Sequence, residues 1–83
     1  MFSAPLAILS CALINDRWQI LTIVAEFDPR RQSRTSFIEY FTGHYAVAGD
    51  DRFKYRLAEV TDRGVVRDFY TKDRLDCGKK DGK

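Results

Sequence analysis

Residues 52–70, RFKYRLAEVTDRGVVRDFY, show the clearest structural pattern in the sequence. Large apolar and polar side chains alternate over residues 53–58, which is the pattern of a strand with one buried face. Thr-Asp-Arg-Gly at 61–64 is typical of a turn, because its glycine adopts positive φ without a steric cost. The alternation resumes over 65–70, so the stretch predicts a β-hairpin with one face in the core and one face in water.

A second hairpin is predicted nearer the N-terminus. Residues 6–14 form a continuous apolar run, Asn-Asp-Arg at 15–17 interrupts it, and residues 18–27 are rich in β-branched side chains. Two such runs around a short Asn/Asp turn indicate a hairpin. Both parities of 18–27 are largely apolar, so we expect this strand to be covered on both faces, as in a central strand or a barrel wall.

The middle of the chain leaves two alternatives open. Residues 28–36, DPRRQSRTS, read as a polar loop. In 37–48, Ser36 followed by Glu39 fits a helix capping box, and aromatic residues recur at a spacing of four. Against a helix, Gly43 would lie in its interior, and the aromatic and β-branched content favours strands. Helix and strand are therefore both retained for 37–48.

These patterns predict a mainly β fold. The expected architecture is a small antiparallel sheet, or an SH3- or OB-like barrel, of four or five strands built from two hairpins. The alternative is an α+β fold with a short helix at 37–48 packed on the sheet. We expect one globular domain over residues 1–75 and a polar, flexible tail over 76–83. The predicted core residues are Trp18, Ile20, Val24, Phe37, Phe41, Phe53, Leu57 and Phe69.

Composition limits the classes of function. The 83 residues are 45% hydrophobic, enough for a compact core, and the net charge of +2 is too small to indicate a nucleic-acid partner by itself. The uncharged start, residues 1–15, lacks the basic residues of a signal peptide and is too short to cross a bilayer. We therefore expect it to form a buried strand in a soluble, cytoplasmic protein with no membrane partner.

No motif for catalysis, metal or cofactor binding is present. Cys11 and Cys77 form no Cys-x-x-Cys pair, and we expect free thiols in a reducing compartment, although a bridge between them would tie the two ends of the chain together. His44, the single histidine, is expected to be a packed or surface residue. The carboxylates lack metal-ligand spacing, and glycine-rich phosphate loops are absent. The sequence predicts no catalytic residue, no metal, no cofactor and no enzymatic activity.

The remaining polar clusters favour a protein partner. Arg and Tyr are enriched at interface hot spots, and a surface that mixes Arg with Asp suits charge-complementary docking. The expected function is a small protein-interaction module that acts by stoichiometric binding, as an inhibitor or adaptor of a larger, nucleic-acid-handling complex of the phage or mobile-element type. The last part is a general expectation for small domains without motifs. The predicted partner-binding residues are Arg30, Arg31, Arg34, Lys54, Arg56, Arg67 and Tyr70.

Two alternative functions stay open. A β-barrel that binds single-stranded nucleic acid needs aromatic platforms flanked by cations. Strand parity, however, separates Phe53 and Tyr55 from Lys54 and Arg56. The second alternative function is that of a small metal-independent ribonuclease. The segment DFYTKDR, residues 68–74, is similar over its few residues to the basic C-terminal strand of small ribonuclease toxins, but the chain lacks their preceding pair of long amphipathic helices.

Overall fold

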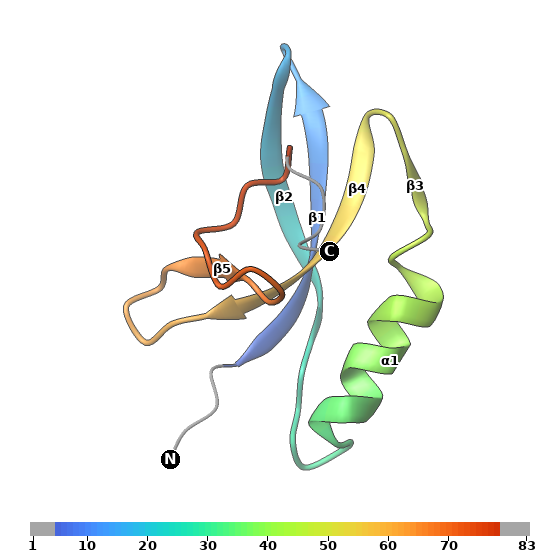
Figure 1. The fold of residues 1–83 in the computed structure, drawn as a ribbon, viewed down its shortest axis with the longest axis vertical. Coiled ribbons are helices and arrows are strands. Elements are labelled where there is room, and N and C mark those ends of the chain that lie inside the picture. The colour runs from blue at the N-terminus through green and yellow to red at the C-terminus, as the bar shows by residue number, and fades with distance from the viewer. Residues whose placement is uncertain (1–4, 79–83) are drawn as a thin grey trace.

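The protein folds into an open, five-stranded antiparallel sheet with one helix (Figure 1), as described by a computed structural model for residues 5–78. The strand order is β2-β1-β4-β3, and β5 also pairs with β4. The mainly β architecture is as predicted, and the sheet does not close into a barrel. The elements are β1 (Leu6–Ile14), β2 (Arg17–Glu26), α1 (Arg34–His44), β3 (Gly49–Asp50), β4 (Phe53–Val60) and β5 (Val66–Asp68).

The predicted N-terminal hairpin is confirmed as β1 and β2. Ile14 pairs with Arg17, so the connection is a two-residue loop of Asn15 and Asp16. Both loop residues have positive φ, 52° and 63°. Two-residue hairpin loops with positive φ at both positions match the right-handed twist of the strands, and Asn and Asp tolerate this conformation better than other non-glycine residues. Local sequence therefore determines this turn.

The hairpin predicted from residues 52–70 is also confirmed. Val60 pairs with Val66, and the turn closes with Thr61 N–H donating to Val65 O at 2.9 Å. Gly64 has a φ of 80°, which is the conformation for which a glycine was expected at this place. On the other side of β4, its residues pair with β1 in an antiparallel register that aligns Leu57 with Ile8.

The middle segment is a helix, so the helical alternative holds and the strand alternative over 44–48 is wrong. The helix begins earlier than 37, because Ser33 is the N-cap and its hydroxyl accepts from the Ser36 N–H at 3.0 Å. The capping box assigned to Ser36 and Glu39 is therefore incorrect by one turn. Gly43 is the second-last residue of α1, where its low helix propensity costs less than in the helix interior.

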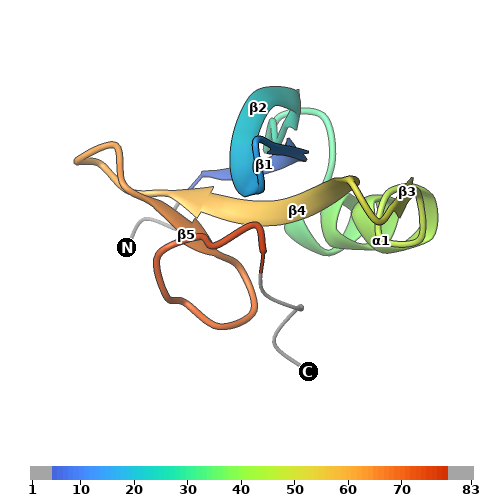
Figure 2. The ribbon, with the colours of Figure 1, turned by 90° about the horizontal axis from the view of Figure 1, so that it is seen from above.

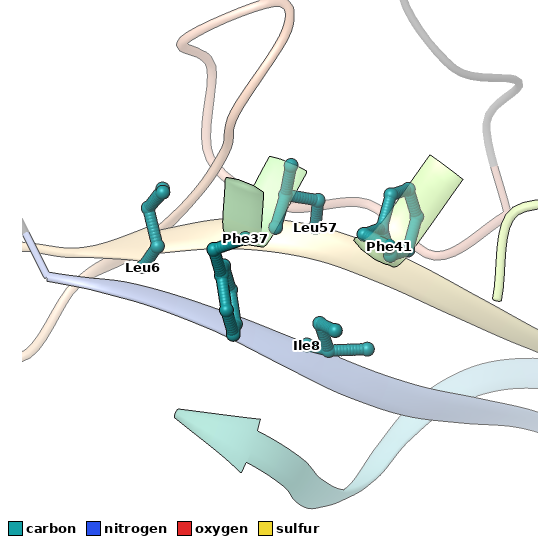
Figure 3. Close-up of a cluster of buried hydrophobic side chains, with 5 residues drawn as sticks. All are labelled: Leu6, Ile8, Phe37, Phe41 and Leu57. Atoms are coloured by element: carbon teal, nitrogen blue, oxygen red, sulfur yellow. The ribbon is translucent and has the colours of Figure 1, made fainter. Parts of the chain in front are cut away.

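The main core lies between α1 and one face of the sheet. Phe37 and Phe41 point from α1 onto Leu6, Ile8 and Leu57, and all five side chains are almost completely buried (Figure 3). The spacing of four residues places both phenylalanines on one face of the helix. Burial of such large apolar side chains is the principal source of stability in a domain of this size.

The opposite face of the sheet is covered by residues 73–78, which follow the turn after β5 and which we call the C-terminal arm (Figure 2). Leu75 of this arm packs with Val66 against Ala7, Leu9 and Ala58. Its backbone is attached to β5, since Leu75 N–H donates to Val66 O at 2.9 Å. Both faces of the sheet are therefore covered, by a helix on one side and by irregular chain on the other.

A disulfide joins Cys11 to Cys77, so the expectation of free thiols is wrong. The strand register places Cys11 on the face of β1 where the C-terminal arm crosses, and both cysteines are buried. Of the predicted tail 76–83, residues 76–78 are packed near this bond, and 79–83 lie outside the described residues. Among the described residues, no helix is long and apolar enough to cross a membrane.

The predicted core is correct in the helix and β4 but wrong in β2. Phe37, Phe41 and Leu57 are buried, and Trp18, Phe53 and Phe69 are partly buried. Ile20 and Val24, by contrast, are 47% and 40% exposed. The reason is that α1 packs over β1 and β4, and the C-terminal arm packs over β1, β4 and β5, which leaves the faces of the edge strand β2 largely open. Coverage of β2 on both faces was also predicted, and it is wrong for the same reason.

Candidate protein-binding site

The seven predicted partner-binding residues do not share one surface. The fold divides them among a loop, the sheet face beneath the C-terminal arm, and a cluster between the helix and β5. The groups are Arg30 and Arg31; Lys54 and Arg56; and Arg34 and Arg67, with Tyr70 nearby in sequence.

The loop pair is exposed, and one member is engaged locally. The Arg30 side chain donates from Nε to Asp28 Oδ1 at 3.2 Å, and its backbone N–H donates to the same oxygen at 3.0 Å. These hydrogen bonds hold the pKa of the Asp28 carboxyl below its usual value, with a smaller contribution from the charge of Arg31. Arg31 lies on the surface of the same loop.

The second pair lies beneath the C-terminal arm. Lys54 Nζ is 4.5 Å from the centre of the Trp18 ring, a cation–π contact between neighbouring parts of the sheet. Arg56 is only 7% exposed, and its Nη2 donates to Cys77 O at 3.2 Å. The interpretation of this side of β4 as a water-facing surface is therefore wrong at Arg56. Alternation along the strand identifies the two faces, but it does not reveal that the arm returns over the polar one.

An open groove of about 580 Å³ borders this region, between β2 and the C-terminal arm. Its lining includes the apolar residues Trp18, Ile20 and Leu75 and the charged residues Asp73, Arg74 and Asp76. Because these charged residues have both signs, the groove is not part of a continuous positively charged surface.

The third group forms the most concentrated arrangement of charges in the described residues. Glu59 lies at the end of β4, and its side chain is 6% exposed. Arg34 Nη2 lies 3.0 Å from Glu59 Oε2, while Lys72 Nζ and Arg67 Nη2 lie 3.2 and 3.6 Å from Oε1. We call these four residues the Glu59 cluster. It joins two of the predicted residues, Arg34 and Arg67, to two that were not predicted.

Local structure explains why these side chains converge. Arg67 is paired directly with Glu59 across the β4–β5 hairpin, so the two side chains lie on the same face. Arg34 is the first residue of α1, and the Ser33 cap fixes where the helix begins. Lys72 has a φ of 66°, an uncommon conformation for a non-glycine residue.

The turn that positions Lys72 is organised by Asp68. Asp68 Oδ1 accepts the backbone N–H groups of Tyr70 and Thr71 at 2.7 and 3.0 Å, and Asp68 O accepts the N–H of Lys72 at 2.9 Å. Asp68 neighbours Arg67 in β5, so its side chain points to the opposite face of the sheet from the Glu59 cluster. Its carboxylate therefore serves the turn and does not neutralise the cluster.

An aromatic ring completes the arrangement. Lys72 Nζ is 4.3 Å from the centre of the Phe69 ring, and the Arg34 guanidinium carbon is 5.9 Å from it. The Tyr70 ring contacts Phe69 with centroids 5.1 Å apart and is 39% exposed. The predicted residue Tyr70 therefore lies beside the cluster without belonging to it.

Cations outnumber the carboxylate in the Glu59 cluster. Arg67 and Lys72 both lie against one oxygen of Glu59, Oε1. The side chains of Arg34, Arg67 and Lys72 are 31%, 39% and 51% exposed, so an external group can reach them. Arg67 Nε is buried and has no hydrogen-bond partner within the described residues. The accessible part of the cluster is therefore the exposed portion of the Arg67 and Lys72 side chains, which can meet an oxyanion.

Sequence reasoning missed Glu59 and Lys72 for different reasons. Glu59 follows Ala58 at the end of the alternating strand, where a carboxylate reads as a surface residue. Lys72 belongs to a polar segment that was interpreted as leading into a frayed tail. The sequence does contain one signal, because Glu59 and Arg67 lie on either side of the predicted turn. A defined hairpin register would have paired these two residues.

No group of metal-ligating side chains occurs within residues 5–78. His44 is exposed at the end of α1, where its Nδ1 lies 3.1 Å from Tyr40 O. It is therefore a surface residue, one of the two placements expected for it. Comparison with known proteins finds no match to a protein-family model, to a curated protein or to a solved structure.

Proposed function

We propose that this protein is a non-enzymatic interaction domain that binds an acidic surface of a protein partner stoichiometrically, as an inhibitor or adaptor. The observation that carries the proposal is that Arg67 and Lys72 share one carboxylate oxygen of Glu59 while their side chains stay 39% and 51% exposed. Arginine is well suited to carboxylates, because its planar guanidinium donates two parallel hydrogen bonds. Asp and Glu side chains of the partner are the expected ligands.

The position of the cluster supports docking of a large partner. Its cations come from α1, from β5 and from the turn that follows β5, so the hydrophobic core and the hairpin hold them in place before binding. Such preorganisation lowers the entropy lost when side chains are ordered in a complex. Phe69 and Tyr70 add aromatic area at the border of the charges, and aromatic residues are enriched at protein interfaces.

Aromatic placement favours a protein partner over single-stranded nucleic acid. Tyr55 packs against Tyr45 with ring centroids 4.9 Å apart, and Phe53 packs against Tyr55 at 5.0 Å. These rings lie on the helix side of the sheet, away from Lys54 and Arg56. Nucleic-acid platforms need open rings with cations beside them, and these two rings are engaged with their neighbours.

The experiment compares two probes of equal charge, a glutamate-rich peptide and a single-stranded oligonucleotide. We expect the peptide to bind and Arg67→Gln or Lys72→Gln to weaken its binding about tenfold or more, as removal of one partner in a charge-assisted contact does. Arg52→Gln is the matched control, because Arg52 is exposed at the opposite end of β4 from Glu59.

The result against the proposal is equally defined. Tight binding of the oligonucleotide, with an affinity that falls steeply with salt and a slope reduced by about one unit per lost cation, would replace it with the nucleic-acid function. Equal losses in Arg52→Gln and Arg67→Gln would remove the Glu59 cluster as the site. A pull-down from the native cell, with and without nuclease, then shows whether the protein binds its partner directly or through nucleic acid.

A further inference from the structure

The loop that joins β2 to α1, residues 27–33, presents two adjacent arginines to solvent. Residues 29–33 are all exposed, and the Arg30 side chain is 89% exposed. Exposed loops of polar residues are the segments at which folded proteins are most readily cut by proteases. The peptide bond between Arg31 and Gln32 is therefore accessible to an enzyme that recognises arginine.

The hydrogen bonds that hold this loop are local. The N–H groups of Arg31 and Gln32 both donate to Asp28 O, at 3.0 and 3.3 Å, and Arg30 donates to the Asp28 carboxylate. Within the described chain, residues 28–32 make no hydrogen bond to the sheet or to α1. The extended conformation that a protease requires therefore breaks only exposed contacts with Asp28, and such contacts contribute little to stability.

Both ends of the loop are anchored, so its opening stays local. The Phe27 N–H donates to Leu6 O at 2.9 Å, and the Phe27 ring lies 5.5 Å from the Phe37 ring, measured between centroids. At the other end Ser33 caps α1. The loop can therefore open between Phe27 and Ser33 without loss of the sheet or the helix.

The other arginines and lysines within residues 5–78 lie in more constrained backbone. The Arg63 turn is closed by the hydrogen bond from Thr61 N–H to Val65 O. The Arg52 carbonyl accepts the N–H of Leu13 at 2.9 Å, which ties that turn to β1. Further basic residues belong to strands, to α1, or to the turn and arm attached to β5: Arg17, Arg34, Lys54, Arg56, Arg67, Lys72 and Arg74.

We propose that the peptide bond between Arg31 and Gln32 is a processing site for an endoprotease of arginine specificity. Such enzymes select arginine through a carboxylate in the pocket for the residue before the cut, and the guanidinium donates to it. Hydrolysis breaks the bond between the Arg31 carbonyl carbon and the Gln32 nitrogen. The oxygen of water enters the new Arg31 carboxylate, and both of its protons end on the new Gln32 ammonium.

The cleaved protein should remain one folded molecule. The cut separates β1 and β2 from α1, β3, β4 and β5. Three kinds of contact cross it, namely the pairing of β1 with β4, the core between α1 and the sheet, and the disulfide from Cys11 to Cys77. The Glu59 cluster lies entirely on the C-terminal side of the cut, so this inference does not depend on the proposed function.

Cleavage changes the role of the disulfide. In the intact chain the two parts stay connected through the loop when the disulfide is reduced. In the cleaved chain the disulfide is the only covalent link between residues 1–31 and 32–83, so its reduction makes their association depend on concentration. A dithiol reductant, itself oxidised to a disulfide, converts Cys11 and Cys77 to thiols. The fold of the cleaved protein should therefore be lost on reduction and dilution.

The test is limited digestion of the oxidised, folded chain with a low proportion of trypsin, followed by mass spectrometry. We expect the first product to be heavier than the intact chain by one water molecule. After reduction and denaturation it should separate into residues 1–31 and 32–83. Its circular dichroism should match that of the intact chain before reduction. After dithiothreitol and dilution, the cleaved protein should lose this signal and the intact chain should keep it.

Variants of the loop test the site itself. Arg30→Gln/Arg31→Gln should slow the first cleavage about a hundredfold or more, because the protease pocket then lacks its charged ligand. Both arginines are changed together, since Arg30 could otherwise replace Arg31 in that pocket. Arg63→Gln is the matched control, an exposed arginine in a closed turn, and it should be cut at the wild-type rate. Protein isolated from its native cell should contain the form cleaved after Arg31.

Several outcomes would overturn the inference. One is a first cleavage at a bond outside residues 28–33, or a folded chain that trypsin does not cut. Another is an unchanged cleavage rate in Arg30→Gln/Arg31→Gln. Loss of the circular dichroism signal on cleavage, before reduction, would show that the cut destroys the fold. Recovery of only the intact chain from the native cell would exclude processing there.

Discussion

Cys11 in the central strand β1 and Cys77 in the C-terminal arm form a disulfide across 66 residues of sequence. The bond fastens the arm over the sheet face that α1 leaves uncovered, beside the buried guanidinium of Arg56. In a chain of 83 residues, a disulfide that closes a loop of this length restricts the conformations of most of the unfolded chain. Small domains with limited cores commonly depend on such links.

The disulfide should contribute about 2 to 4 kcal/mol to the free energy of unfolding, the typical range for a disulfide in a protein. Urea unfolding of the oxidised and reduced protein measures it. Cys11→Ala, Cys77→Ala and the double variant provide a matched set. If the link itself stabilises the fold, Cys77→Ala should lose almost as much as the double variant. An unchanged midpoint on reduction would contradict this prediction.

Glu59→Gln should destabilise the protein, because it removes the carboxylate that three cations share. A wholly buried pair that loses one partner costs about 3–5 kcal/mol. The cations here are partly exposed, so we expect a loss of about 1 to 3 kcal/mol in chemical denaturation. Glu39→Gln, an exposed glutamate in α1, is the control and should change stability by less than about 0.5 kcal/mol. Equal effects of the two variants would refute a structural role for the cluster.

Two glycine-to-alanine variants should have opposite effects. A Cβ at Gly49 would lie 2.6 Å from Phe53 O, and the φ of 135° is unsuitable for an L side chain. Gly49→Ala should therefore lower the melting temperature. A Cβ at Gly43 meets nothing within 4 Å, so Gly43→Ala should stabilise α1 by up to about 1 kcal/mol through helix propensity. Thermal unfolding followed by circular dichroism measures both, and a loss in Gly43→Ala would contradict the helix boundary.

The pKa of Tyr45 should lie above its usual value of 10.0, chiefly because its hydroxyl is hydrogen-bonded to that of Tyr40, with a further contribution from burial. A raised pKa in the folded state stabilises the protein below pH 10, and this contribution is lost as the pH rises through the folded pKa. Tyr40→Phe should lower the Tyr45 pKa toward 10.

An NMR titration of the Tyr45 ring carbons measures this pKa directly. Tyr70→Phe is the control, because the Tyr70 ring contacts Phe69 and should leave the Tyr45 titration unchanged. A Tyr45 pKa that does not move in Tyr40→Phe would exclude the shared hydrogen bond as the main cause.

Both hairpins were predictable because their information is local. Turn residues and alternating side chains act over a few positions, and the Asn15–Asp16 loop and Gly64 adopt the conformations expected of them. The helix could not be separated from a strand, since Phe37 and Phe41 satisfy the helical spacing while their residue type favours strands. The N-cap residue could not be assigned to Ser33 from the sequence, because the preceding loop contains two serines.

Long-range coverage could not be read from sequence. Whether Ile20 is buried depends on the strand order, and whether Arg56 is exposed depends on the return of the C-terminal arm. The same limit applies to the candidate site. Arg34 and Arg67 were identified by their residue type, but their convergence on Glu59 depends on the register of β5 and on the position of α1. The assignment of a protein partner and of a cytoplasmic location remains a prediction.

The place of β1 between β2 and β4 has a consequence for the order of folding. The β1–β2 hairpin closes a two-residue loop and can form quickly, within about 1–10 microseconds. The pairing of Ile8 with Leu57 must instead close the intervening chain, and contacts of such sequence separation slow folding. On the ribosome, the edge of β1 that pairs with β4 in the folded protein therefore stays unpaired until β4 has emerged. During that interval both edges of the apolar β1–β2 hairpin are unpaired, and a chaperone or a neighbouring nascent chain can bind to them.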